Sequence, residues 1–201
     1  MIIPIRTLGD PVLKTPAKPV ERFDDALRRL SENMLETMYD APGVGLAGPQ
    51  VGISLRLFVF DDGATGPMFV ANPELLFPEL EILEEEGCLS FPGAFVDCAR
   101  PDYAEVAGTS LTGEPVHFVG TGLLARCLQH EADHTVGTVF GDRISDRNRK
   151  RLTQEHDSLA DEFPADWPAS TPVVAGPDKT RLLDPTRGDI TGDRSGGAHV
   201  E

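Results

Sequence analysis

Two histidines four positions apart, His130 and His134, give the sequence its clearest chemical signal. On a helix they lie one turn apart on the same face, so both imidazoles can bind one divalent metal ion, as in the H-E-x-x-H pattern. Glu131 follows the first histidine, and a carboxylate there can take a proton from a water on the metal and return it to a leaving group. Two histidines leave the ion under-coordinated, so the pattern predicts a third ligand elsewhere in the chain.

Two loops precede this pair in the sequence. Residues 43–52 are rich in glycine, which predicts a loop that another group approaches closely, or a tight packing corner. Residues 87–93 contain Cys88 between glycine, serine and proline and predict a turn-rich loop after an acidic run.

The elements that position these residues begin with helices. Apolar residues in 27–38 recur at helical spacing, with Asp24 or Asp25 available as the cap. The histidine pair lies in a second predicted helix, from residue 121 or 122 to Gly137, and residues 146–163 predict a third with a thin apolar stripe.

Short strands are predicted between these helices, and their short length around well-separated helices favours an α+β fold. We expect mainly antiparallel sheets packed around the central helix that carries the metal motif, plus the N-terminal helix. The strands are expected at residues 55–60, 68–73, 80–83, 104–110 and 115–119, the last two joined as a hairpin.

Composition excludes several classes of function. The net charge of −15 argues against general affinity for nucleic acid and for anionic membranes. Specific binding to DNA is not expected either. No run reaches the roughly 18 apolar residues of a membrane span, and the first residues resemble no signal peptide. Three irregularly spaced cysteines fit a reducing compartment. The expected location is the cytoplasm.

The chain is predicted to hold one catalytic domain, residues 1–163, with a core at about 3–151. Residues 164–201 are acidic and rich in proline and glycine, which predicts a disordered tail. A local basic cluster comes just before the tail, at Arg143, Arg147, Arg149, Lys150 and Arg151.

Three motifs follow one another along the chain: Gly45-Leu46-Ala47-Gly48-Pro49-Gln50, Glu86-Gly87-Cys88-Leu89-Ser90 and Gln129-His130-Glu131-Ala132-Asp133-His134. In their order and spacing they resemble the motifs of the peptide deformylases, metal hydrolases that remove the formyl group from nascent N-formylmethionyl peptides. The resemblance extends from about Ile3 to Arg151.

The resemblance implies that Cys88 is the third ligand beside His130 and His134, with one coordination position left for water, as in a catalytic site. Cys98 and Cys127, by contrast, are expected to be small buried hydrophobes rather than ligands. Sulfur and nitrogen ligands suit zinc, iron, nickel or cobalt. The resemblance implies Fe²⁺, with Zn²⁺, Ni²⁺ or Co²⁺ as alternatives in purified protein.

The resemblance also implies roles for other residues. Glu131 would act as general base and acid, while the Gln50 side chain and the Leu89 N–H would stabilise the oxyanion. An Arg100–Asp133 pair would steady the metal helix. The residues expected to bind the methionyl substrate are Val44, Gly45, Leu123 and Cys127.

Two other interpretations stay open. A zincin-type metallopeptidase would take its third ligand from downstream, where Glu155 and His156 are available. A homologue that docks on ribosomes, with weak or altered deformylase activity, would use the basic cluster, through Arg147, Arg149, Lys150 and Arg151.

Overall fold

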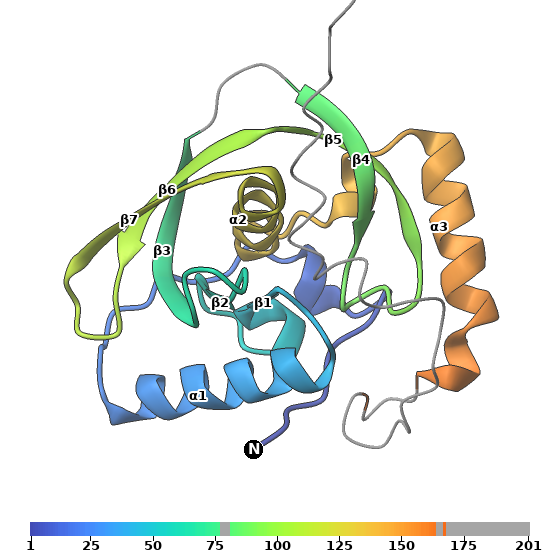
Figure 1. Ribbon diagram of the computed structural model, residues 1–201. Coiled ribbons are helices and arrows are strands. Elements are labelled where there is room, and N and C mark those ends of the chain that lie inside the picture. Colours follow the sequence, from blue (N-terminus) through green and yellow to red (C-terminus); the bar gives the residue numbers. More distant parts are fainter. Residues whose placement is uncertain (77–80, 164–166, 168–201) are drawn as a thin grey trace, which may run out of the picture.

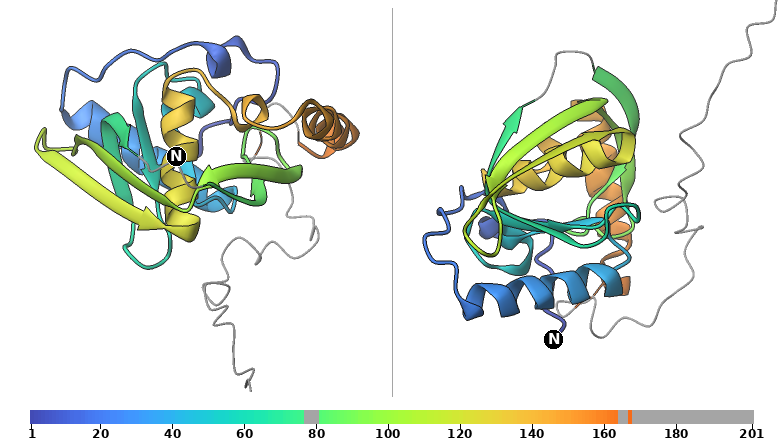
Figure 2. Two further views of the ribbon diagram at one scale, coloured as in Figure 1. Left: turned by 90° about the horizontal axis from the view of Figure 1, so that it is seen from above. Right: turned by 60° about the vertical axis from the view of Figure 1, so that its left-hand side comes forward.

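A computed structural model describes residues 1–76, 81–163 and 167. Its centre is helix α2 (Gly122–Thr135), which lies between two antiparallel sheets (Figures 1 and 2). The larger sheet has the strand order β1-β2-β3-β6-β7 and the smaller one pairs β4 with β5. The strands are β1 (Gly45–Ala47), β2 (Leu57–Phe60), β3 (Met68–Leu76), β4 (Glu81–Gly87), β5 (Phe95–Pro101), β6 (Tyr103–Thr109) and β7 (Pro115–Thr121).

Helix α2 is enclosed on nearly all sides, since every residue from Ala125 to Thr135 is buried. Such a helix needs internal partners for its polar side chains, because water cannot supply them. The helix ends at Thr135, and the chain turns away at Gly137, whose positive φ of 77° suits glycine. A β carbon there would lie 2.9 Å from Pro16 N, so the N-terminal arm crosses close to this end of the helix.

Two helices cover the outside. Helix α1 (Asp25–Asp40) is capped by Asp24, whose carboxylate accepts from the N–H groups of Ala26 and Leu27, and it packs on β1 and β2. Helix α3 (Asp146–Ser158) is capped by Ser145 and lies against β5 on the side away from α2 (Figure 1). Short 3₁₀ turns complete the fold: η1 (Pro11–Lys14), η2 (Gly48–Val51), η3 (Phe140–Asp142) and η4 (Ala160–Glu162).

The prediction of an α+β fold around the motif helix is confirmed. The three predicted helices and the 104–119 hairpin are present, although the last helix ends at Ser158, before a separate turn. Strands β1 and β5 were not predicted. Apart from Trp167, the tail predicted for 164–201 lies outside the described residues, and the division at 163 stays a prediction. No described helix is long and apolar enough to span a membrane.

Candidate metal centre

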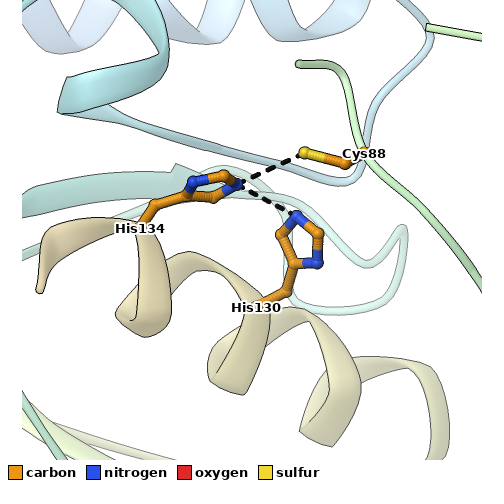
Figure 3. Close-up of side chains that lie close together, drawn as sticks. All are labelled: Cys88, His130 and His134. Carbon is orange, nitrogen blue, oxygen red and sulfur yellow. Dashed lines mark hydrogen bonds between the residues drawn. The ribbon is translucent and has the colours of Figure 1, made fainter. Parts of the chain in front are cut away.

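Cys88, His130 and His134 meet at the face of α2 that is turned toward the loop after β4 (Figure 3). The His134 Nε2 atom lies 3.3 Å from Cys88 Sγ and 3.2 Å from His130 Nε2. All three candidate ligand atoms are within 4.8 Å of one another. The helix supplies the two histidines one turn apart, as the H-E-x-x-H spacing predicts, and the loop after β4 brings the Cys88 thiol to them.

These distances fit a common metal ion. Ligands bound tetrahedrally at about 2.0–2.3 Å are separated from one another by roughly 3.3–3.6 Å, close to the separations of 3.2 and 3.3 Å seen here. One thiol and two imidazoles form a donor set that suits zinc or a first-row transition metal. Three protein ligands leave a coordination position for water or substrate, as catalytic sites require.

Glu86 orients the first histidine. Its Oε1 lies 2.7 Å from His130 Nδ1, and an ionised carboxylate can only accept. The Nδ1 atom of His130 therefore carries the proton, which leaves the lone pair of the neutral imidazole on Nε2, facing Cys88 and His134. A carboxylate behind a ligating histidine is a frequent feature of metal sites.

Glu86 belongs to a buried ion network between α2 and the smaller sheet. Arg100 donates two hydrogen bonds to Glu86, at 2.7 and 2.8 Å, and one to Asp133 at 2.9 Å. Arg126 adds another to Glu86 at 2.9 Å, and Arg143 binds Asp133 from outside. The predicted Arg100–Asp133 pair is thus present and buried. Removing one partner of a buried pair leaves the other charge without compensation, which is strongly destabilising.

The network sets the pKa of Glu86. Burial by itself raises the pKa of this carboxyl group, but hydrogen bonds from Arg100 and His130 outweigh burial and hold the pKa well below its usual range. Glu86 therefore stays ionised at neutral pH and remains an acceptor for His130.

The two histidines differ in their protonation. Burial, followed by the charge on His130, lowers the pKa of His134 and favours the neutral imidazole that a metal binds. Burial also acts to lower the pKa of His130, but Cys88 and Glu86 outweigh it and the pKa rises. Metal binding to this group would consequently release a proton.

Glu131 lies on the same helix with its carboxyl group buried. Only 4% of the residue is exposed, and Oε2 has no hydrogen-bond partner in the described part of the chain. Burial raises the pKa of Glu131 to about 7. A carboxyl group with a pKa near neutrality can both accept and return a proton at physiological pH.

Gln50 is 1% exposed, and its amide orientation is fixed by a neighbour. The Ala47 N–H donates to Oε1 at 2.7 Å, so the NH₂ group must point the other way. It faces Cys88 Sγ at 3.5 Å and Ser90 Oγ at 3.4 Å. The side chain therefore presents a donor to the thiol loop.

Leu89 follows the predicted cysteine ligand. Within the described ranges its N–H has no acceptor, while the N–H groups of Ser90 and Phe91 bond to Cys88 Sγ and Cys88 O. A free backbone donor next to Cys88 is what an oxyanion site needs.

The residues predicted to bind substrate gather beside α2. The Cys127 thiol lies 3.5 Å from Val44 O, and Gly45 packs against Glu131. Leu123 lies one turn before Cys127 and is 39% exposed. The structure brings these four residues to one region, and their role in binding methionine stays a prediction.

Glu86 and Arg126 were not assigned a role from the sequence. Glu86 stands in a run of three glutamates, and nothing local separates it from its exposed neighbours. The zincin alternative is not supported, because among the described residues Cys88 occupies the third-ligand position. Glu155 pairs instead with Arg151, and His156 lies against the Phe91 ring.

Sequence comparisons with known proteins all point to one family. The polypeptide deformylase family matches residues 2–150. A peptide deformylase of Acidothermus cellulolyticus is 51% identical over 148 residues, covering 73% of this chain and 81% of the relative. One from Thermotoga maritima is 50% identical over 153 residues, covering 75% and 92%.

Solved structures agree as well. The crystal structure of a Legionella pneumophila peptide deformylase has a TM-score of 0.76 and 43% identity, covering 79% of this chain and 95% of that one. A Synechococcus elongatus deformylase in complex with actinonin has a TM-score of 0.72 and 42% identity, covering 78% and 86%. The match over most of the chain, together with the geometry of the three motifs, shows that this chain belongs to the peptide deformylase family.

Proposed function

We propose that this deformylase hydrolyses the formyl amide of N-formylmethionyl nascent peptides with Glu131 as its general base and acid. Cys88, His130 and His134 would hold one divalent metal. The observation that carries the proposal is the convergence of these three ligands on the helix that also carries the buried, unpartnered Glu131 carboxylate. Formate and a free N-terminal methionine are the products.

The metal is proposed to be Fe²⁺, in line with the resemblance, while Zn²⁺, Ni²⁺ and Co²⁺ suit the same ligands. When bound, such an ion supplies Lewis acidity and lowers the pKa of a water molecule. Glu86 would keep the His130 ring oriented toward it, through the 2.7 Å hydrogen bond to Nδ1.

Glu131 moves the proton in this proposal. Its carboxylate takes a proton from the attacking water and then delivers it to the nitrogen of the leaving amine. The raised pKa of about 7 suits both halves of the reaction, because neither form is strongly disfavoured near neutral pH.

The oxyanion that develops on the formyl oxygen would be stabilised by two donors of the chain. The Gln50 NH₂ group faces Cys88 Sγ, and the Leu89 N–H directly follows Cys88 in the chain. The Gln50 amide is already oriented by the Ala47 N–H. Donors that are fixed in advance stabilise developing charge without reorganisation.

The methionyl side chain is proposed to lie against Val44, Leu123 and Cys127, which are apolar and adjoin the site. Gly45 would bring its backbone close to the peptide, since glycine has no side chain to keep it away. Leu123 is the most exposed of these three residues and would become covered on binding.

The test compares the wild-type enzyme with Glu131→Gln on a formyl-Met tripeptide, measuring formate and bound metal together. The proposal expects the variant to retain metal and to lose kcat by roughly 100-fold or more. A variant that keeps its metal and releases formate at the wild-type rate would refute the role of Glu131.

Contact with the ribosome is a second proposal, favoured by the exposed face of α3. Arg147 and Lys150 are exposed and have no ion-pair partner in the described ranges. Arg149 and Arg151 instead pair with Asp146 and Glu155 on the same helix. The two unpaired cations would carry most of any attraction to ribosomal RNA, in a cytoplasmic enzyme acting on emerging chains.

Co-sedimentation with ribosomes at low and moderate salt tests this second proposal. We expect Arg147→Ala combined with Lys150→Ala to weaken binding more than Arg149→Ala combined with Arg151→Ala does. Equal binding by the wild type and a variant lacking all four charges would rule the contact out.

A further inference from the structure

The N-terminal arm, residues 5–17, connects the three motifs of the site. It runs from beside α1 toward α2, turns at η1 and reaches the end of α2, after which the chain returns to α1 (Figure 1). On the way it donates a backbone hydrogen bond to each motif segment or its immediate end: Arg6 N to Gln50 O at 2.7 Å, Leu8 N to Ser90 O at 3.0 Å and Ala17 N to Thr135 O at 3.1 Å.

Two of these bonds hold the oxyanion donors. The carbonyl of Gln50 accepts from Arg6, which fixes the backbone from which the Gln50 amide projects. The carbonyl of Ser90 accepts from Leu8, and Ser90 directly follows Leu89. The arm therefore spans the gap between a side-chain donor and a backbone donor that belong to separate loops.

A single residue far along the chain holds the start of this arm. The Ile5 N–H donates to Trp167 O at 2.8 Å. Trp167 is 7% exposed, and the Phe163 ring packs edge-to-face on its indole with centroids 5.3 Å apart. It is the only tryptophan in the chain.

The apolar surroundings of Trp167 reach the same loops. Ile5 and Val51 are buried in the cluster that contains Trp167, and Leu89 packs against that cluster. Val51 directly follows Gln50. The cluster that contains Trp167 therefore includes the residue after Gln50 and contacts Leu89, in addition to the arm's hydrogen bonds.

The arm has little structure of its own to keep it in place. Apart from η1 it contains no helix or strand, so contacts with other segments must hold it in place. Trp167 supplies a large buried anchor at the point where the arm begins.

We propose that Trp167 is a positioning residue for deformylation: it anchors the arm that fixes the backbones of Gln50 and Ser90, and thereby the two oxyanion donors. This inference rests on the proposed roles of Gln50 and Leu89. Misplacing donors weakens transition-state binding more than substrate binding. The effect should therefore appear in kcat, while metal content, which depends on other residues, stays unchanged.

The experiment uses full-length, metal-loaded Trp167→Ala and Trp167→Phe with a formyl-Met tripeptide. We expect Trp167→Ala to lower kcat by roughly 10- to 100-fold, with KM within about twofold of the wild type and full metal content. Trp167→Phe keeps an aromatic anchor and should recover most of the loss. Wild-type kcat in Trp167→Ala would overturn the inference.

A double-mutant cycle with Gln50→Ala separates positioning from general destabilisation. If Trp167 acts through Gln50, the loss caused by Trp167→Ala shrinks in the Gln50→Ala background. Independent effects that multiply would contradict the inference while leaving Gln50's own role intact. Full activity of Gln50→Ala alone would instead refute the proposed oxyanion donor, and with it the basis of this inference.

Phe163→Ala provides a second route if Trp167→Ala does not fold. It removes the ring beside Trp167 and keeps the indole, whose fluorescence then reports its environment. We expect a shift of emission to longer wavelength, easier quenching by acrylamide and a lower kcat, all together. Loosening of the indole with unchanged kcat would overturn the inference, and so would a solvent-exposed indole in the wild-type enzyme.

Discussion

A β carbon on Gly45 would lie 2.5 Å from Glu131 Oε1 and 2.7 Å from Glu131 Cγ. Real β carbons do not approach other atoms so closely, so the glycine makes room for the Glu131 side chain. The glycine of the first motif and the acid of the third are thus two halves of one packing contact. The need for a glycine at position 45 therefore has a structural explanation that does not depend on any substrate.

Gly45→Ala should therefore displace Glu131. We expect kcat for formate release to fall by roughly 100-fold or more, as after loss of a general base, with bound metal unchanged. Gly141→Ala is the matched control, because a β carbon at this buried glycine would make ordinary contacts, the nearest at 3.6 Å. Equal activity of the two variants would show that Glu131 tolerates the added methyl group.

Cys88 is expected to be required for metal binding. Cys88→Ala removes one of three ligands, so metal measured after gel filtration should drop well below one ion per chain, and formate release should cease. Cys98→Ala removes a buried thiol outside the candidate ligand group, so this variant should keep its bound metal and its formate release. One bound metal ion per chain in the Cys88→Ala variant would instead support a third ligand downstream of the histidine pair, as in zincins.

Glu86→Gln should weaken metal binding without touching a ligand. The amide still accepts one hydrogen bond but cannot serve Arg100, Arg126 and His130 together, so the His130 ring loses its fixed orientation. We expect metal affinity to fall by about 10- to 100-fold and the free energy of unfolding to fall by about 3–5 kcal/mol. Glu85→Gln, on the exposed side of the same strand, should change neither.

Asp142 ties η3 to the N-terminal arm through Lys14. Burial raises the pKa of Asp142, but hydrogen bonds from Lys14 and the Val139 N–H outweigh burial and lower it. A folded-state pKa below the unfolded one contributes stability above about pH 4 that is lost as the pH falls further.

Asp142→Asn and Lys14→Met should consequently cost stability at neutral pH and less at about pH 3. The loss in the free energy of unfolding at neutral pH is expected to stay below about 1 kcal/mol because the Lys14–Asp142 pair is partly exposed. Urea unfolding of chelated protein measures it without interference from metal release. A deficit independent of pH would mean that the Asp142 charge is not what stabilises the contact.

The sequence predicted the parts of the fold that local patterns determine. Helix α1 follows from its apolar stripe and Asp24 cap, and the β6–β7 hairpin from its alternation and turn. Strand β5 was missed because it depends on pairing with β4, which no pattern within 95–101 specifies. Strand β1 lies inside the glycine-rich loop, where small residues conceal the extended backbone.

Some residues of the candidate site could likewise be predicted from the sequence, and others could not. Motif spacing and the family resemblance together identified the three predicted ligands, Glu131 and Gln50. The network that supports them joins Glu86, Arg100, Arg126 and Asp133, which are distant in sequence and meet only when the smaller sheet packs on α2. Such contacts depend on tertiary packing, and a single sequence carries no local signal for them.

The central claim is that one metal ion at this centre makes the chain a deformylase. Metal-free protein should be titrated anaerobically with Fe²⁺ or Ni²⁺ while formate release from a formyl-Met tripeptide is followed. We predict no release without metal, a linear rise, and saturation at about one ion per chain, as three protein ligands around one ion require. Formate release by metal-free protein, or no release from the fully loaded enzyme, would contradict the claim.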